Sequence, residues 1–290
     1  MCSLCTAGHY KNDATLVSVV HSVAHASGLV FSVDASELYV TQGNTGSTTV
    51  IHVRKSDGTW GTLDDFVLGA IGGISTGGPD GNLYVTEPLK HCIRMIDMEG
   101  DSGLTTIAGS CGTAGSTDGT ASLFNGTWGI AVDASGTAYV TDEQNHCIRR
   151  IGASGVVDTI AGTCGSSGYA DGVGGSAKFA SPKGIAIDDA HNIWVADYGN
   201  HRIRKMALVN GTGSWNVSTV AGSGVPAISD GFGTSALVSQ PWGVALDGAG
   251  NVFFTEIYST AIRMLDSGGW VSTVAHAPVL TYSSGIAVDG

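Results

Sequence analysis

A short pattern of glycine and aliphatic residues ending in aspartate returns along this chain of 290 residues, at intervals of 42 to 59 residues. The full form spans residues 128–133 and reads WGIAVD. An interval of this size suits one four-stranded propeller blade plus a variable loop. The copies begin at Gly28, Gly73, Gly129, Gly184, Gly243 and Gly285.

Each repeat unit keeps the same order of segments. The inner pattern is followed by a turn, an aromatic-rich segment such as residues 139–141 (YVT), a segment that carries Ile-Arg, and a segment such as residues 270–275 (WVSTVA). Short segments in which apolar and polar residues alternate, separated by turn residues, predict four antiparallel strands per unit. Glycine and alanine suit the inner strand of a propeller, where neighbouring backbones converge on the axis. The chain is therefore predicted to be an all-β propeller.

The two ends of the chain hold partial units. Residues 15–20 (TLVSVV) resemble a fourth, outer strand, and residues 285–290 resemble a first strand with nothing behind it. We therefore expect six blades, five of them complete and the sixth split or unfinished. Its missing strands are expected to come from chain beyond Gly290 or from a neighbouring molecule that adds a strand. The predicted domains are a Cys-containing leader over 1–14 and the propeller over 15–290.

Composition narrows the classes of function. Charged residues make up 13% of the chain and the net charge is −12, whereas nucleic-acid binders normally present a basic surface. No apolar run approaches the length of a membrane helix, and the first residues lack the pattern of a signal peptide. We therefore expect no nucleic-acid partner and no membrane insertion. A surface with few charges lacks the usual protection against association.

Residues 145–151 (NHCIRRI) and 200–206 (NHRIRKM) resemble the NHL repeat. The resemblance covers nearly the whole chain from about residue 28, and it departs from the pattern at residues 42–46 and 258–261. The long blades, with a loop such as residues 171–174 (DGVG), resemble NHL arrays of large extracellular proteins such as teneurins. The family implies a six-bladed propeller as its common form. It does not imply one function, because its members bind proteins or RNA, act as sensors or adhesion modules, or catalyse at a metal.

Four cysteines hold paired positions in two successive repeats. One pair precedes Ile-Arg and the other follows Ile-Ala-Gly, nearly symmetric about the intervening turn. This arrangement predicts two cross-strand disulfides. Each is expected to stabilise the folded chain by roughly 3 kcal/mol. The alternative is zinc ligation with the adjacent His91 and His146, although neighbouring residues on a strand point to opposite faces. The predicted pairs are Cys92 with Cys111 and Cys147 with Cys164, and Cys2 and Cys5 form a further candidate pair.

Disulfides place a protein in an oxidising compartment. Three N-glycosylation sequons fall in predicted loops or blade connections, at Asn125, Asn210 and Asn216. Together they favour a secreted or cell-surface glycoprotein.

A carboxylate recurs seven residues before each arginine of the Ile-Arg segments. Those positions oppose each other across a hairpin, so we expect structural ion pairs; the alternative is a ring of charges that binds an ionic ligand. His91, His146 and His201 recur every 55 residues and are expected to cap turns rather than to hold a metal. The predicted pairs are Glu87 with Arg94, Asp142 with Arg149, Asp197 with Arg204, and Glu256 with Arg263.

Catalytic motifs are missing from the sequence, with no nucleophile elbow, zinc-protease motif or phosphate loop. We therefore expect no catalytic residues, no metal ligands and no cofactor, but a structural or interaction module of a larger surface or filamentous assembly. Its expected partners are other protein subunits, including copies of itself, and glycans. The alternative is a metal-dependent lyase or lactonase-like propeller, with calcium or zinc in the axial channel near the inner-strand aspartates Asp34, Asp133, Asp188, Asp247 and Asp289.

Overall fold

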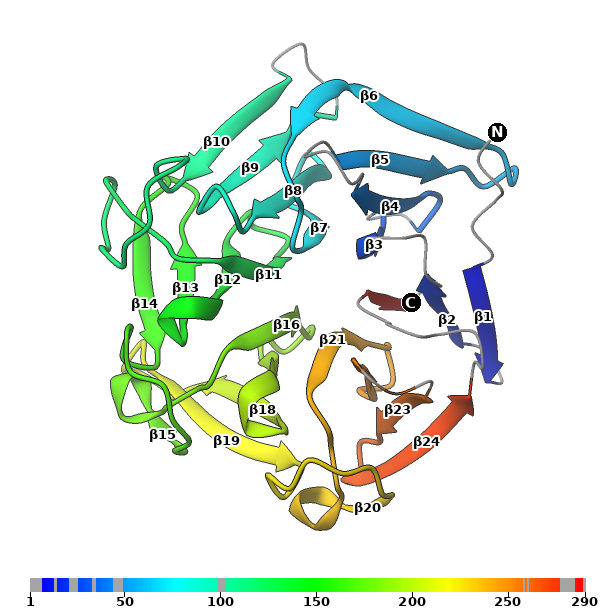
Figure 1. The fold of residues 1–290 in the computed structure, drawn as a ribbon, viewed down its shortest axis with the longest axis vertical. Coiled ribbons are helices and arrows are strands. Elements are labelled where there is room, and N and C mark those ends of the chain that lie inside the picture. Colours follow the sequence, from blue (N-terminus) through cyan, green and yellow to red (C-terminus); the bar gives the residue numbers. More distant parts are fainter. Residues whose placement is uncertain are drawn as a thin grey trace.

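The protein forms a ring of β-sheets around a central axis (Figure 1). The computed structural model describes residues 7–12, 15–20, 26–32, 35–43, 49–98, 103–257, 259, 261–276 and 285–288. The helical segments within these ranges are four 3-10 turns: η1 (Glu143–Asn145), η2 (Gly174–Ser176), η3 (Tyr198–Asn200) and η4 (Gly233–Ser235). The prediction of an all-β propeller is confirmed.

Blades 1 to 3 are four-stranded antiparallel sheets that follow the chain from the axis outward. Blade 1 contains β3 (Ala26–Phe31), β4 (Leu38–Gly43), β5 (Thr49–Arg54) and β6 (Trp60–Leu68). Blade 2 contains β7 (Ile74–Gly77), β8 (Asn82–Glu87), β9 (Cys92–Ile96) and β10 (Leu104–Ala108). Blade 3 contains β11 (Thr127–Val132), β12 (Ala138–Asp142), β13 (Cys147–Ile151) and β14 (Val157–Ala161).

Blades 4 and 5 each have five strands. Blade 4 contains β16 (Pro182–Ile187), β17 (Ile193–Asp197), β18 (Arg202–Leu208), β19 (Trp215–Ala221) and the outermost β15 (Gly172–Val173). Blade 5 contains β21 (Pro241–Leu246), β22 (Val252–Glu256), β23 (Ala261–Leu265), β24 (Trp270–His276) and the outermost β20 (Gly231–Phe232). The segments expected to be loops before each inner strand therefore add a fifth strand to the outer edge.

A three-stranded sheet lies between blades 5 and 1 (Figure 1). It contains β25 (Ile286–Val288) on the axis, then β2 (Thr15–Val20), then β1 (Ala7–Asn12). The prediction that residues 15–20 form an outer strand was wrong, because β2 pairs directly with the inner strand β25. The sheet also extends into the segment expected as a leader, since β1 pairs with β2. Cys2 and Cys5 lie outside the described residues.

Glycines on the inner strands allow neighbouring blades to approach each other. A Cβ atom on Gly129 would collide with the carbonyl oxygen of Lys183 in blade 4, and one on Gly184 would collide with the carbonyl oxygen of Trp242 in blade 5. The space between blades is filled by apolar clusters, such as the one that joins Tyr139 of blade 3 to residues of blade 4. This tight packing fixes the distance of each inner strand from the axis. Among the described residues no helical segment has the length of a membrane span.

Candidate functional site

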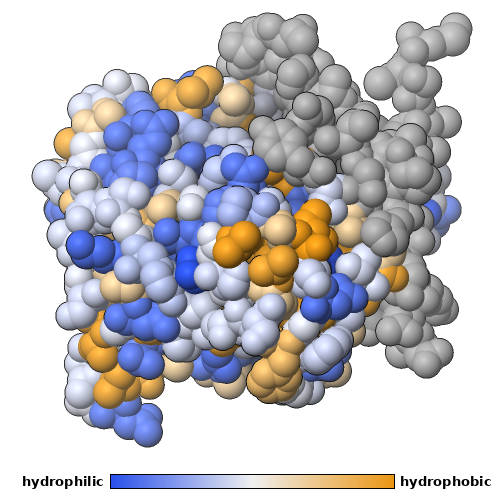
Figure 2. All heavy atoms as spheres, turned by 60° about the horizontal axis from the view of Figure 1, so that its bottom comes forward, coloured by the Kyte–Doolittle hydropathy of each residue, from blue (hydrophilic) through white to orange (hydrophobic). Residues whose placement is uncertain are grey.

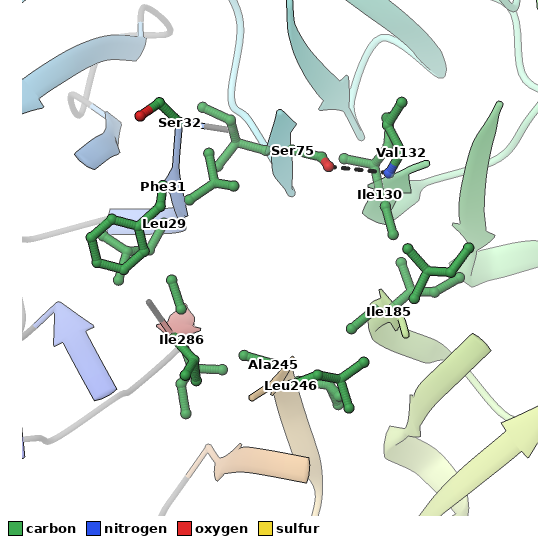
Figure 3. A pocket seen from close by; sticks show the side chains of 18 of the residues that line it. Leu29, Phe31, Ser32, Ser75, Ile130, Val132, Ile185, Ala245, Leu246 and Ile286 are labelled. Carbon is green, nitrogen blue, oxygen red and sulfur yellow. Dashed lines mark hydrogen bonds between the residues drawn. The ribbon is translucent and has the colours of Figure 1, made fainter. Parts of the chain in front are cut away.

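The inner strands enclose an axial cavity of about 510 Å³ (Figure 3). Among the described residues, the side chains that line it are aliphatic or aromatic, apart from Ser32 and Ser75. The Ser75 hydroxyl is engaged, because it accepts a hydrogen bond from the backbone N–H of Val132 (3.1 Å) and donates one to the carbonyl oxygen of Thr76 (3.1 Å). General acid–base catalysis needs a titratable group within reach of the substrate. The side chains that line this cavity offer an apolar surface instead.

The described inner-strand aspartates accept hydrogen bonds from the backbone of the turns that follow them. Asp133 accepts hydrogen bonds from the backbone N–H groups of Ser135 and Thr137, and Asp247 accepts equivalent ones from Ala249 and Asn251. Burial would raise the pKa of the Asp188 carboxyl, but hydrogen bonds from Asn192 and Trp194 bring its pKa below the ordinary value. These carboxylates are turn residues in the described blades. Asp34 and Asp289 lie outside the described residues.

The other end of the axis narrows to a cavity of about 80 Å³ that is bordered by glycines, Trp128 and Trp242. Trp128, Lys183 and Trp242 each precede the inner-strand glycine of their blade. The Lys183 ammonium lies 3.7 Å from the ring centre of Trp128 and 4.5 Å from that of Trp242, and it is paired with Glu143 at 2.8 Å. Burial lowers the pKa of Lys183 from its ordinary value, against the opposite effect of Glu143. This cation and its aromatic neighbours join blades 3, 4 and 5 and were not predicted from the sequence.

The four predicted pairs of carboxylate and arginine lie within hydrogen-bonding distance, from 2.6 to 3.2 Å. In blades 3, 4 and 5 the arginine is fully buried and pairs with a second carboxylate as well. Burial raises the pKa of Asp142, Asp197 and Glu256, although the neighbouring arginine opposes that shift. These groups are inside the blades, so they do not form an open ring for an ionic ligand. The second carboxylates are Asp118, Asp171 and Asp230.

These second carboxylates were not predicted to pair with the arginines, although the sequence indicated a loop at residues 171–174, which contains Asp171. Asp171 also accepts hydrogen bonds from the backbone N–H and the hydroxyl of Thr219 on β19. Its loop is thereby attached to the outer edge of blade 4, where β15 pairs with β19. The signal was the similar interval between each Asp-Gly pair and the following arginine: 31 residues in blade 3 and 33 residues in blades 4 and 5.

Both predicted disulfides of the described chain are present. Cys92 is joined to Cys111 and Cys147 to Cys164. Each disulfide lies beside a buried carboxylate, Glu87 or Asp142, and these are the groups of potential metal ligands found among the described residues. The sulfur atoms are already bonded to each other, which leaves no thiolate to bind a metal.

The three repeated histidines connect successive blades. His91, His146 and His201 adopt a left-handed backbone conformation with φ between 55° and 58°. The Nδ1 atom of each ring accepts a backbone N–H from the following blade, at 3.0 to 3.1 Å. A protonated Nδ1 carries a hydrogen and cannot accept that bond. The contacts therefore require the neutral imidazole.

This requirement predicts a pH dependence of stability. Burial, and then the nearby Arg202, lower the pKa of His201 from 6.5. Below pH 6.5 the unfolded chain binds the proton more readily than the folded chain. The stabilisation by His201 is therefore complete above pH 6.5 and is lost as the pH falls from there through the lower pKa of the folded protein.

Urea unfolding at pH 7 and pH 5 measures this effect in the wild type and in His201→Asn. Asparagine tolerates the left-handed backbone and offers an acceptor oxygen that does not titrate. We expect the wild type to lose more stability than the variant between these two pH values. Equal losses would show that the imidazole does not carry the effect.

The predicted sequons differ in exposure. Asn210 and Asn216 are exposed, on the hairpin that joins β18 to β19 and on β19 itself. Asn125 is half-buried, and Thr127 of its sequon is fully buried. Glycosylation of the three sites stays a prediction, for which the blade 4 positions have the accessible side chains.

Comparison with protein-family models matches the NHL repeat to residues 124–151 and 179–206, in blades 3 and 4. Two curated proteins are similar to the chain. Protein SUPPRESSOR OF QUENCHING 1, chloroplastic, of Arabidopsis thaliana is 27% identical over 226 residues, which cover 71% of this chain and 20% of that protein. NHL repeat-containing protein 2 of Gallus gallus is 34% identical over 120 residues, 40% of this chain and 16% of that protein. The chain thus spans a fifth or less of the length of these relatives.

Solved structures of similar shape belong to proteins of different kinds. A chain of a nidogen/laminin complex has a TM-score of 0.64 and 17% identity over 94% of both chains. The gluconolactonase XC5397 of Xanthomonas campestris has a TM-score of 0.65 and 16% identity, over 94% of this chain and 82% of that one. A streptogramin B lyase has a TM-score of 0.56 and 16% identity, over 89% of this chain and 72% of that one. Likeness at this level of identity concerns the fold. The chain is a β-propeller in which residues 124–151 and 179–206 match the NHL repeat.

Proposed function

We propose that this propeller is a non-catalytic interaction module of a secreted or cell-surface glycoprotein. The observation that carries the proposal is the axial cavity, the place where a propeller enzyme would hold its metal and its acid or base. Its lining side chains in the described part of the chain are aliphatic, aromatic or serine, and Asp133, Asp188 and Asp247 at the ends of inner strands hold turns. Such a lining offers no described titratable side chain for proton transfer, and its polar surface comes largely from the backbone of the inner strands.

Three further observations support this role. The two disulfides suit an oxidising compartment. The long blades resemble the NHL arrays of teneurins, as the sequence indicates. A propeller of similar shape occurs in the nidogen/laminin complex. The lyase and lactonase neighbours have the same fold, so a metal-dependent enzyme is the alternative that an experiment has to exclude.

The outer edge of blade 5 is the surface that we propose for self-assembly. Figure 2 looks toward the edge of the ring that carries β20, where apolar side chains lie in patches among polar ones. Phe232 of β20 and Trp270 of β24 are cross-strand partners, and they are 63% and 49% exposed. Large aromatic side chains of this kind carry much of the binding energy in protein interfaces. The proposed occupant is a second copy of the chain, because β20 is the edge strand of its sheet and such an edge can pair with the same edge of another copy.

Light scattering over a range of protein concentrations tests this role. We expect the oxidised wild-type chain to self-associate, and the double variant Phe232→Ser/Trp270→Ser to raise the dissociation constant at least about tenfold. Trp60→Ser is the matched control, because Trp60 is 39% exposed on blade 1. A strict monomer that retains stoichiometric zinc or calcium would contradict the proposal and favour the enzyme.

A further inference from the structure

A cross-link that blades 3 and 4 share is missing among the described residues of blade 5. In blade 3 the side-chain amide of Asn145 donates to the buried carboxylate of Asp142 (2.9 Å) and to the carbonyl oxygen of Gly115 (2.7 Å). In blade 4 the amide of Asn200 donates equally to Asp197 and to Gly168, both at 2.8 Å. One nitrogen with two N–H groups therefore joins the end of the second strand to the loop before the blade.

Ser259 stands at the corresponding position of blade 5, three residues after the carboxylate of Glu256. Its hydroxyl accepts the backbone N–H of Ala261 at 2.9 Å, within its own turn. Serine lacks the amide, so it cannot reproduce the two N–H groups of asparagine. Ala227 occupies the loop position that corresponds to Gly115 and Gly168, three residues before the second carboxylate, Asp230.

A cavity of about 280 Å³ lies at this position. Its described lining consists of Pro226, Ala227, Ile228, Ser239, Glu256 and Ser259. Glu256 is fully buried and Ser259 is 8% exposed, whereas Ile228 at the rim is 47% exposed. The cavity therefore combines an accessible apolar rim with a buried carboxylate.

The carboxylate can accept a further hydrogen bond. Oε1 of Glu256 accepts the backbone N–H of Ser239 (2.6 Å), and Oε2 accepts from Arg263 (3.2 Å). The corresponding oxygen of Asp142 accepts from Arg149 and from Asn145 as well. An ionised carboxylate has about four acceptor positions, so Oε2 of Glu256 can accept the bond that asparagine makes elsewhere.

We infer that this cavity of blade 5 is a binding site for a primary carboxamide with a small apolar substituent. The carboxamide nitrogen donates to Glu256, as the amide of Asn145 donates to Asp142, and the substituent lies against Pro226 and Ile228. A neutral amide suits the site better than an ammonium ion, because the Arg263 guanidinium already pairs with Glu256. The inference is independent of self-assembly and of the proposed function.

NMR titration of the ¹⁵N-labelled chain with isobutyramide tests the site. The reporter is the backbone amide of Ser239, which donates to Glu256. We expect a saturable shift with a dissociation constant in the millimolar range, as befits a ligand of six heavy atoms. The backbone amide of Asn125 donates to Asp142 in blade 3, where Asn145 already fills the equivalent site. It is the internal control, and its NMR signal should not shift.

Two variants and two probes complete the experiment. Ser259→Asn fills the cavity with the missing side-chain amide. Glu256→Asp/Ser259→Asn restores both the aspartate and the asparagine of blade 3. Both variants should weaken isobutyramide binding at least about tenfold while the fold is retained. N,N-dimethylisobutyramide has no N–H group and should not bind. The inference is overturned if isobutyramide gives no saturable shift, if both amides bind alike, or if isobutylammonium binds and isobutyramide does not.

Discussion

Replacing Arg204 with methionine is expected to destabilise the propeller by about 3–5 kcal/mol, because it leaves a buried charge without its partner. The Arg204 side chain is fully buried and donates to Asp197 (2.6 Å) and to Asp171 (2.7 Å). Asp197 is also fully buried, and burial already raises the pKa of its carboxyl. Urea unfolding at pH 7 measures the loss.

Arg150→Met is the matched control on the surface of blade 3. Arg150 pairs with Asp158 at 2.6 Å, but both side chains are more than 40% exposed. Exposed pairs of this kind contribute at most about 1 kcal/mol. Adding Asp197→Asn to Arg204→Met removes the unpaired charge and should recover part of the stability. Similar losses for Arg204→Met and Arg150→Met would contradict the structural role of the buried arginines.

Removing one disulfide is expected to cost about 3 kcal/mol, because the unfolded chain gains the freedom that the cross-link withholds. The double variant Cys147→Ala/Cys164→Ala opens a loop with a sequence separation of 17 residues. Urea unfolding without reductant should give the reduced stability, and a reducing agent should then lower it further by opening Cys92–Cys111, the other disulfide of the described residues. A free energy of unfolding equal to that of the oxidised wild type would show that this disulfide does not stabilise the folded chain.

The blades could be predicted from the sequence because each repeat keeps its inner glycine, its aromatic strand and its arginine. The spacing of seven residues brings Asp142 and Arg149 together across a hairpin, whose geometry is local, but they do not oppose each other as predicted: Asp142 is opposite Cys147 and Arg149 is opposite Val140, so the contact is diagonal. The two disulfides were predictable for the same reason, since Cys92 begins β9 and Cys111 lies in the turn that follows the neighbouring strand β10, just beyond the cross-strand position predicted for it. Local periodicity thus determined most of the fold.

Contacts between distant segments were not predictable in this way. The pairing of β2 with β25 brings together residues from opposite ends of the chain, and no periodic signal marks their register. The cation site of Lys183 depends on three blades meeting at one end of the axis. Its signal was the position before each inner glycine, where Trp128, Lys183 and Trp242 stand. The cavity beside Ser259 was visible only by comparison of equivalent positions in three dimensions.

The proposed role requires that the protein work where disulfides persist. The most direct test is to alkylate free thiols in intact producing cells and to map the protein's peptides by mass spectrometry without reduction. The account predicts linked peptides that join Cys92 to Cys111 and Cys147 to Cys164, with none of these four sulfurs alkylated. Alkylated thiols at these four positions in the folded protein would contradict it and place the propeller in a reducing compartment.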